Sequence, residues 1–139
     1  MRNLGLDVGT KTIGVAISDK TGMLASPFGV IRFSDLIEAL EEVVRIIKEC
    51  NIEEVVIGLP KNMDNSEGFA SERSIKFKNL LENVIPYKIC LFDERLSTVE
   101  AEKILIERGR SRQKRRKEID AVAATLILEA YLKKGKNNE

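Results

Sequence analysis

Two adjacent runs of alternating apolar residues near the start of the chain constrain its fold more than any other feature. Apolar side chains recur at every second position over residues 4–8 and again over 13–18, and only Gly9-Thr10-Lys11-Thr12 separates the two runs. A period of two is typical of β-strands, and so short a connection predicts an antiparallel hairpin. A third strand is expected over residues 29–33.

The rest of the chain alternates helical and extended patterns. Ser34 can cap a helix in which Leu36, Leu40, Val43 and Ile47 recur at the helical period, with Ile37 and Val44 beside them. A short continuous apolar run over 55–59 indicates a buried strand, and a further strand is expected over 87–92. Further helices are expected over 70–82, with Ala70, Ser74, Phe77 and Leu81 facing inward, over 97–108 after a capping box at Ser97, and over 117–133. The apolar side of the last helix is expected to comprise Val122, Ala123, Leu126, Ile127 and Ala130.

This order predicts an α/β fold in which a mixed five-stranded sheet carries helices on both faces. The length of 139 residues fits one domain, which we expect over 1–134, followed by a disordered tail at 135–139. No run approaches the roughly 20 apolar residues of a membrane span, and no signal-like segment opens the chain. A soluble cytoplasmic protein with no membrane partner is therefore expected.

The absence of histidine limits the chemistry of this chain. It excludes Ser-His-Asp and Cys-His catalysis and imidazole-ligated zinc. Cys50 and Cys90 have the spacing of neither a disulfide framework nor a zinc site, so ordinary reduced thiols are expected. Any catalysis must then use carboxylates, lysines, hydroxyls and a hard metal ion.

Three acidic residues are candidates for such a site, and each has a structural alternative. Asp7 lies on a strand of apolar residues, where it can serve a site or accept hydrogen bonds from the turn amides that follow. Glu94 follows an apolar strand, where α/β sheets present functional side chains, but it is also part of a surface-like Asp-Glu-Arg cluster. Asp120 begins the last helix, where a carboxylate also interacts favourably with the helix dipole. These residues alone leave both interpretations open.

Four segments of the chain resemble the YqgF family, also called RuvX. They are Leu4-Gly-Leu-Asp-Val-Gly-Thr-Lys-Thr-Ile-Gly-Val-Ala-Ile-Ser-Asp19, Val56-Ile-Gly-Leu-Pro-Lys-Asn-Met-Asp64, Asp93-Glu-Arg-Leu-Ser-Thr98 and Ile119-Asp-Ala-Val-Ala-Ala124. The resemblance spans essentially the whole chain and implies a ribonuclease H-like fold. Members of the family are described as Holliday junction resolvases, and bacterial members are linked to maturation of the 16S ribosomal RNA 5′ end. One departure is Asn65, since family members commonly carry glycine after the aspartate at this point.

The resemblance also implies a catalytic site. The family's acidic positions fall on Asp7, Glu94 and Asp120, which would bind the metal and form the catalytic cluster. Mg²⁺ is the expected ion, with Mn²⁺ as a substitute, because both accept carboxylate and water ligands. The implied reaction is hydrolysis of a phosphodiester by metal-activated water.

A strongly basic segment precedes Asp120. Residues 108–117 contain seven lysines and arginines and no acid, although the net charge of the chain is only +1. Such a run suits phosphate backbones, and its structural alternative is a solvated loop. We expect nucleic-acid contacts from Lys11, Lys61, Asn62, Arg110, Arg112, Lys114, Arg115 and Arg116, with Thr10 as a weaker candidate.

Two other classes of function compete with a nuclease. A non-catalytic nucleic-acid-binding factor of ribosome assembly would keep the fold and the basic segment. An ATP-binding domain of the actin and Hsp70 type would share the hairpin, because residues 7–14 also resemble the first phosphate loop of that superfamily. The expected partner of the nuclease is structured RNA or branched DNA, with ribosomal precursor particles as a further candidate. Sequence leaves open the choice between the two nucleic acids and between a monomer and a homodimer.

Overall fold

The computed structural model describes the backbone of residues 1–60, 69–94 and 112–137, and the side chains of 1–59, 71–92 and 121–134. The elements in chain order are β1 (Asn3–Val8), β2 (Thr12–Ser18), β3 (Ala25–Arg32), α1 (Leu36–Glu49), β4 (Glu54–Pro60), α2 (Phe69–Glu82), β5 (Lys88–Glu94) and α4 (Arg112–Asn137). None of the helices described is long and apolar enough to cross a membrane. The capping box at Ser97 and the helix expected over 97–108 lie outside the described residues.

The five strands form one mixed sheet in the order β3-β2-β1-β4-β5. β1 pairs antiparallel with β2, as the hairpin pattern predicted, and β2 pairs antiparallel with β3. β4 lies parallel to β1, and β5 lies parallel to β4. The predicted mixed five-stranded sheet is confirmed, with β1 as its central strand.

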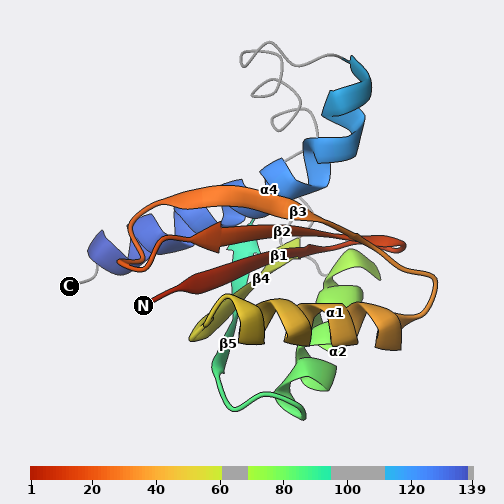
Figure 1. Cartoon of the computed structure of the whole chain (residues 1–139), viewed down its shortest axis with the longest axis horizontal. Helices are drawn as coiled ribbons and strands as arrows, with labels where there is room; N and C mark the ends of the chain where they lie inside the picture. Colours follow the sequence, from red (N-terminus) through yellow and green to blue (C-terminus); the bar gives the residue numbers. More distant parts are fainter. Residues whose placement is uncertain (61–68, 95–111, 138–139) are drawn as a thin grey trace.

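Two cores lie on opposite faces of this sheet, with α1 and α2 on one side and α4 on the other (Figure 1). Leu4, Leu6 and Val8 belong to the larger core beneath α1 and α2. The smaller core packs Ala16 and Val56 of the sheet against Ala124, Ile127 and Leu128 of α4. Because successive strand residues point to opposite faces, every second residue of β1 faces α4.

The first helix and the third strand differ in detail from the sequence prediction. Asp35, rather than Ser34, caps α1, because its Oδ1 accepts from the Ile37 backbone N at 2.9 Å. Ile37 is 51% exposed, although it was placed beside the apolar face of the helix. The strand expected over 29–33 runs over Ala25–Arg32 and includes Pro27, which an edge strand tolerates.

The boundaries of α2 and β5 also differ from the prediction. α2 begins at Phe69, one residue earlier than expected, and its buried side includes Ser74, Phe77 and Leu81 as predicted. β5 begins one residue later, at Lys88, and continues to Glu94, because its pairing with β4 extends to Pro60. Glu94 is therefore the last residue of a strand and not a residue of the loop after it.

The last helix is longer than the sequence patterns predicted. α4 begins at Arg112, so the second half of the basic segment is helical rather than a loop. It continues to Asn137, three residues into the stretch expected to be a disordered tail. Its buried side is also rotated: Val122 and Ile127 are buried as expected, but Ala123, Leu126 and Ala130 are only half-buried. The remaining buried positions are Ala121, Ala124, Thr125 and Leu128.

Candidate active site

Asp7 lies near the carboxyl end of β1, on the face of the sheet that α4 covers. It pairs with Gly14 of β2, and its side chain is partly exposed. Leu6 is fully buried on the other face, so Asp7 projects away from Leu6 as strand alternation predicted. Asp7 makes a polar or electrostatic interaction, so it is not an isolated carboxylate. Beyond it the Gly9 N donates to the Thr12 O at 2.8 Å and closes the hairpin.

Two glycines allow α4 to lie unusually close to this face. A Cβ placed on Gly5 would lie 2.9 Å from the Leu128 Cβ and 3.1 Å from the Ala124 O. A Cβ on Gly58 would lie 2.6 Å from the Ile127 Cδ1. β1 and β4 therefore approach α4 closely at these two glycines.

Glu94 and Asp120 have described backbones, but their side chains lie outside the described residues. Glu94 ends β5, which is separated from β1 only by β4. Leu6 of β1 pairs with Ile57 of β4, and Ile57 pairs with Leu91 of β5. All three strands run in the same direction. Asp120 lies in α4 one turn before Ala124, the residue whose carbonyl faces Gly5. Among the described side chains no three Cys, Asp or Glu residues group as a metal site.

The expected nucleic-acid contacts divide between described and undescribed parts of the chain. Lys11 is exposed in the turn between β1 and β2, and its carbonyl accepts from the Phe33 N at 3.0 Å. Thr10 is also exposed in that turn. Lys61, Asn62 and Arg110 lie outside the described residues. The other four expected contacts have helical backbones at the start of α4, without described side chains, namely Arg112, Lys114, Arg115 and Arg116.

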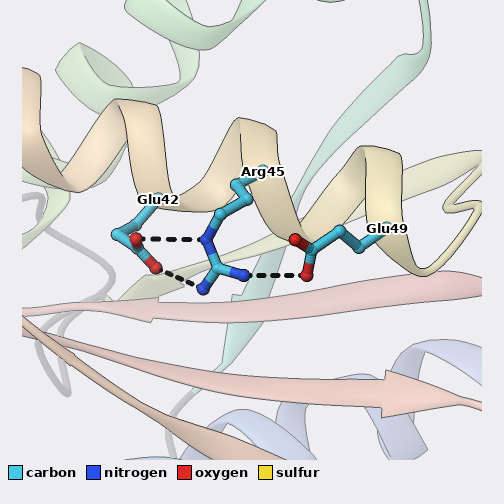
Figure 2. A network of polar contacts seen from close by, with 3 residues as sticks. All are labelled: Glu42, Arg45 and Glu49. Carbon is cyan, nitrogen blue, oxygen red and sulfur yellow. Dashed lines mark hydrogen bonds and ion pairs between the residues drawn. The ribbon is translucent and has the colours of Figure 1, made fainter.

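The outer surface of α1 has the opposite charge. Figure 2 shows Arg45 between two carboxylates, with Nη2 2.6 Å from Glu42 Oε2 and Nη1 2.8 Å from Glu49 Oε2. Hydrogen bonds with Glu42 and then Glu49 raise the pKa of Arg45, and the bond from Arg45 lowers the pKa of Glu42. Glu38 and Glu41 are exposed on the same helix. Because Arg45 is already engaged by two acids, α1 has excess negative charge and repels phosphate.

The comparisons with known proteins agree with this architecture. The family model described as RuvX: Holliday junction resolvase matches residues 1–134. The chain belongs to the RuvX family. Because of this membership the chain is a nuclease, an enzyme that hydrolyses phosphodiester bonds, as the resemblance implied.

Relatives of this RuvX-family chain match it over nearly their whole length. A Staphylococcus haemolyticus protein named "Putative pre-16S rRNA nuclease" is 52% identical over 132 residues, covering 93% of each chain. A protein of the same name from Caldanaerobacter subterraneus is 48% identical over 139 residues, covering 99% of this chain and all of the relative.

Two solved structures share the fold at low sequence identity. The Fowlpox virus resolvase, solved with its substrate Holliday junction DNA, has a TM-score of 0.62 and 16% identity, with 96% of this chain and 98% of that chain covered. Thermus thermophilus RuvC, solved with a Holliday junction substrate, has a TM-score of 0.60 and 10% identity, with 98% and 96% covered. The predicted ribonuclease H-like fold is confirmed.

Proposed function

We propose that this chain is a metal-dependent endonuclease in which Asp7, Glu94 and Asp120 form the catalytic carboxylate cluster. The position of Asp7 carries the proposal: it is a partly exposed acid near the carboxyl end of the central strand, on the face that α4 approaches. Carboxyl ends of parallel strands are where α/β sheets present functional groups. Family membership favours this function over the ATP-binding alternative.

Strand register supports the inclusion of Glu94. Phe92 packs its ring against Tyr131 of α4, so residue 92 of β5 faces α4. Alternation assigns residue 94 to the same face, the one that Asp7 occupies. Continued by one residue, the pairing of β1 with β4 places Gly58 beside Asp7, and Gly58 pairs with Phe92 of β5. Residue 94 is therefore two residues further towards the carboxyl end of β5.

Helix geometry supports the inclusion of Asp120. Residues 120, 124 and 128 are spaced by four and share one side of α4, and the last two face Gly5. One helical turn back from Ala124 is about 6 Å along α4. Two residues forward from Gly5 to Asp7 is about 6.6 Å along β1. Asp7 and Asp120 are thus at similar distances along the chain from the contact between Gly5 and Ala124.

The donor chemistry fits a hard divalent cation. Three carboxylates in a chain without histidine form an all-oxygen set, which suits Mg²⁺, with Mn²⁺ as a substitute. A bound ion would supply an activated water and neutralise charge on the reacting phosphate oxygens. Asp7 would bind from the strand, while Glu94 and Asp120 would complete the ligand set from the neighbouring strand and the helix.

Charge distribution supports a nucleic-acid substrate that approaches along the start of α4. The basic helical residues precede Asp120, exposed Lys11 lies in the hairpin turn after Asp7, and the acidic surface of α1 lies on the other side of the sheet. We propose the 5′ end of precursor 16S ribosomal RNA as the substrate, following the names of the close relatives, with ribosomal precursor particles as partners and the cytoplasm as the compartment. The family description favours Holliday junctions as the second candidate. Junction resolution needs two paired active sites and hence a dimer, whereas RNA trimming does not.

A cleavage assay with one matched variant tests the proposal. Purified protein is incubated with Mg²⁺ or Mn²⁺ and precursor ribosomal RNA, single-stranded RNA and DNA, or a four-way junction. Asp7→Asn should abolish cleavage by removing a ligand charge, while Asp35→Asn, at the N-cap of α1, keeps both the cap and the activity. If the wild type binds a substrate but cleaves none, the non-catalytic assembly factor is the correct class.

A further inference from the structure

Tyr131 joins α4 to two strands of the sheet. Its hydroxyl oxygen lies 3.5 Å from the Cys90 Sγ on β5, and the Glu54 carboxylate on β4 is close enough to raise the pKa of Tyr131. Its ring meets Phe92 edge-on, with centroids 5.7 Å apart. The Lys134 Nζ lies over the Phe92 ring, 5.6 Å from its centroid. One side chain of α4 is therefore bound by three side chains from two strands.

Glu54 belongs to a row of polar side chains that crosses four strands. The Asn3 Nδ2 donates to Glu54 Oε1 at 2.7 Å, and the Asn3 backbone N donates to the Ser18 Oγ at 2.7 Å. The Lys88 Nζ lies 3.7 Å from Glu54 Oε2. Glu54 is 8% exposed, and a buried carboxylate is stable only when its oxygens are paired. The row therefore fixes the orientation of the Glu54 carboxylate near the Tyr131 hydroxyl.

The hydroxyl of Tyr131 stays protonated in this position. Burial, followed by the contacts with Cys90 and Glu54, raises the pKa of Tyr131 far above its ordinary value. The proton of the phenol therefore remains available for the contact with the Cys90 thiol, in which either group can donate.

The direction of α4 on the sheet depends on contacts spread along the helix. Gly5 and Gly58 contact its middle, at Ala124, Ile127 and Leu128. Tyr131 adds a contact on the C-terminal side of these, and Asp120 lies at a similar distance on their N-terminal side. A change in helix direction at Tyr131 would therefore be transmitted to Asp120, which is about 16 Å away along the helix.

We infer that Tyr131 is a positioning residue, which sets the direction of α4 through Glu54 and Cys90 and so holds Asp120 at the metal site. The inference rests on the proposed function, because it assigns Asp120 to that site. A purely structural role for Tyr131 would affect only the stability of the fold. A positioning role also affects the affinity for metal.

Direct metal binding distinguishes these roles without relying on cleavage. Mn²⁺ affinity is measured by calorimetry on the wild type, Tyr131→Phe and Tyr87→Phe, at a temperature where circular dichroism shows all three folded. Tyr131→Phe should bind Mn²⁺ measurably more weakly than the wild type, because Asp120 would no longer be held in position. Tyr87, which is 44% exposed, provides the matched control and should leave the affinity unchanged.

A second variant separates the hydroxyl from the ring. Phe92→Leu removes the edge-on contact but keeps the hydrogen bonds of Tyr131, so it should weaken Mn²⁺ binding less than Tyr131→Phe. Unchanged affinity in Tyr131→Phe would overturn the inference and leave the proposed nuclease intact. A wild type that binds no Mn²⁺ would overturn both. A wild type that binds Mn²⁺, with the expected loss in Tyr131→Phe, but cleaves no substrate would support the positioning role and contradict only the nuclease.

Discussion

Replacing Gly5 with alanine tests the close contact between β1 and α4. The new Cβ would lie 2.9 Å from the Leu128 Cβ, whereas carbon atoms in contact sit about 3.5–4.0 Å apart, so α4 must move by roughly 0.6–1.1 Å. The neighbouring atoms are a Cβ and a backbone carbonyl, which cannot rotate away. Overpacking of this kind costs about 1–3 kcal/mol. Alanine regains roughly 0.5–1 kcal/mol over glycine within a strand, which leaves a net loss of up to about 2.5 kcal/mol.

Gly29→Ala provides the matched control, because nothing lies within 4 Å of a Cβ at that position. It should be neutral or up to about 1 kcal/mol more stable than the wild type. The free energy of unfolding is measured by urea titration with circular dichroism, since the chain has no tryptophan to report unfolding by fluorescence. If Gly5→Ala proves as stable as Gly29→Ala, the close approach of α4 to β1 is wrong.

The same pair of variants tests whether α4 carries a catalytic group. A displacement near 1 Å at a reacting group can reduce the rate by up to about 100-fold. Cleavage by Gly5→Ala, measured where the variant is fully folded, should therefore fall far more than cleavage by Gly29→Ala. A destabilised Gly5→Ala that cleaves at the wild-type rate would contradict the assignment of Asp120.

Three further predictions concern the turn, the helix cap and the metal. Asp19 accepts hydrogen bonds from the Thr21 hydroxyl and the Leu24 and Met23 amides, which lower its pKa to about 2. The pKa of Asp19 is depressed in the folded state, so its stabilising effect is present above about pH 4 and is lost as the pH falls towards 2. The difference in melting temperature between wild type and Asp19→Asn should therefore shrink between pH 6 and pH 2.5. A difference that stays constant would refute this prediction. Asp35→Ala should lower the free energy of unfolding by about 1 kcal/mol, whereas Asp35→Asn should not, as measured by urea titration. Chelation by EDTA should abolish cleavage and excess Mg²⁺ should restore it, and cleavage that persists in EDTA would exclude a metal-dependent mechanism.

Much of the sheet follows from local sequence patterns. The period-two runs predicted the β1–β2 hairpin, and the continuous apolar run predicted the buried strand β4, because side-chain burial on a strand follows alternation. The 3.6-residue period predicted α1 and the inner side of α2 for the same kind of reason. Residue types also limited the chemistry, since a chain without histidine must use carboxylates, lysines, hydroxyls and a hard metal ion. The family resemblance then indicated three candidate carboxylates.

Other features depend on contacts between distant segments, which local patterns do not contain. β5 reaches Glu94 because β4 continues to pair with it as far as Pro60. The buried side of α4 is rotated towards Ala124 and Leu128 because Gly5 leaves room for the Leu128 side chain and the Ala124 carbonyl, and Gly58 leaves room for Ile127. The start of α4 at Arg112 agrees with the good helix propensity of arginine, lysine and glutamine, which the interpretation of this segment as a basic loop had set aside.

Sequence alone thus predicted the order of the described strands and helices, the place of Asp7 on an apolar strand, and the kind of chemistry open to the chain. Only the tertiary structure decided which residues meet: the polar row from Ser18 through Asn3 and Glu54 to Lys88, and the contact of Tyr131 with Cys90. The physical reason is that burial periodicity is a property of each segment, whereas register and helix direction depend on packing between segments far apart in the chain.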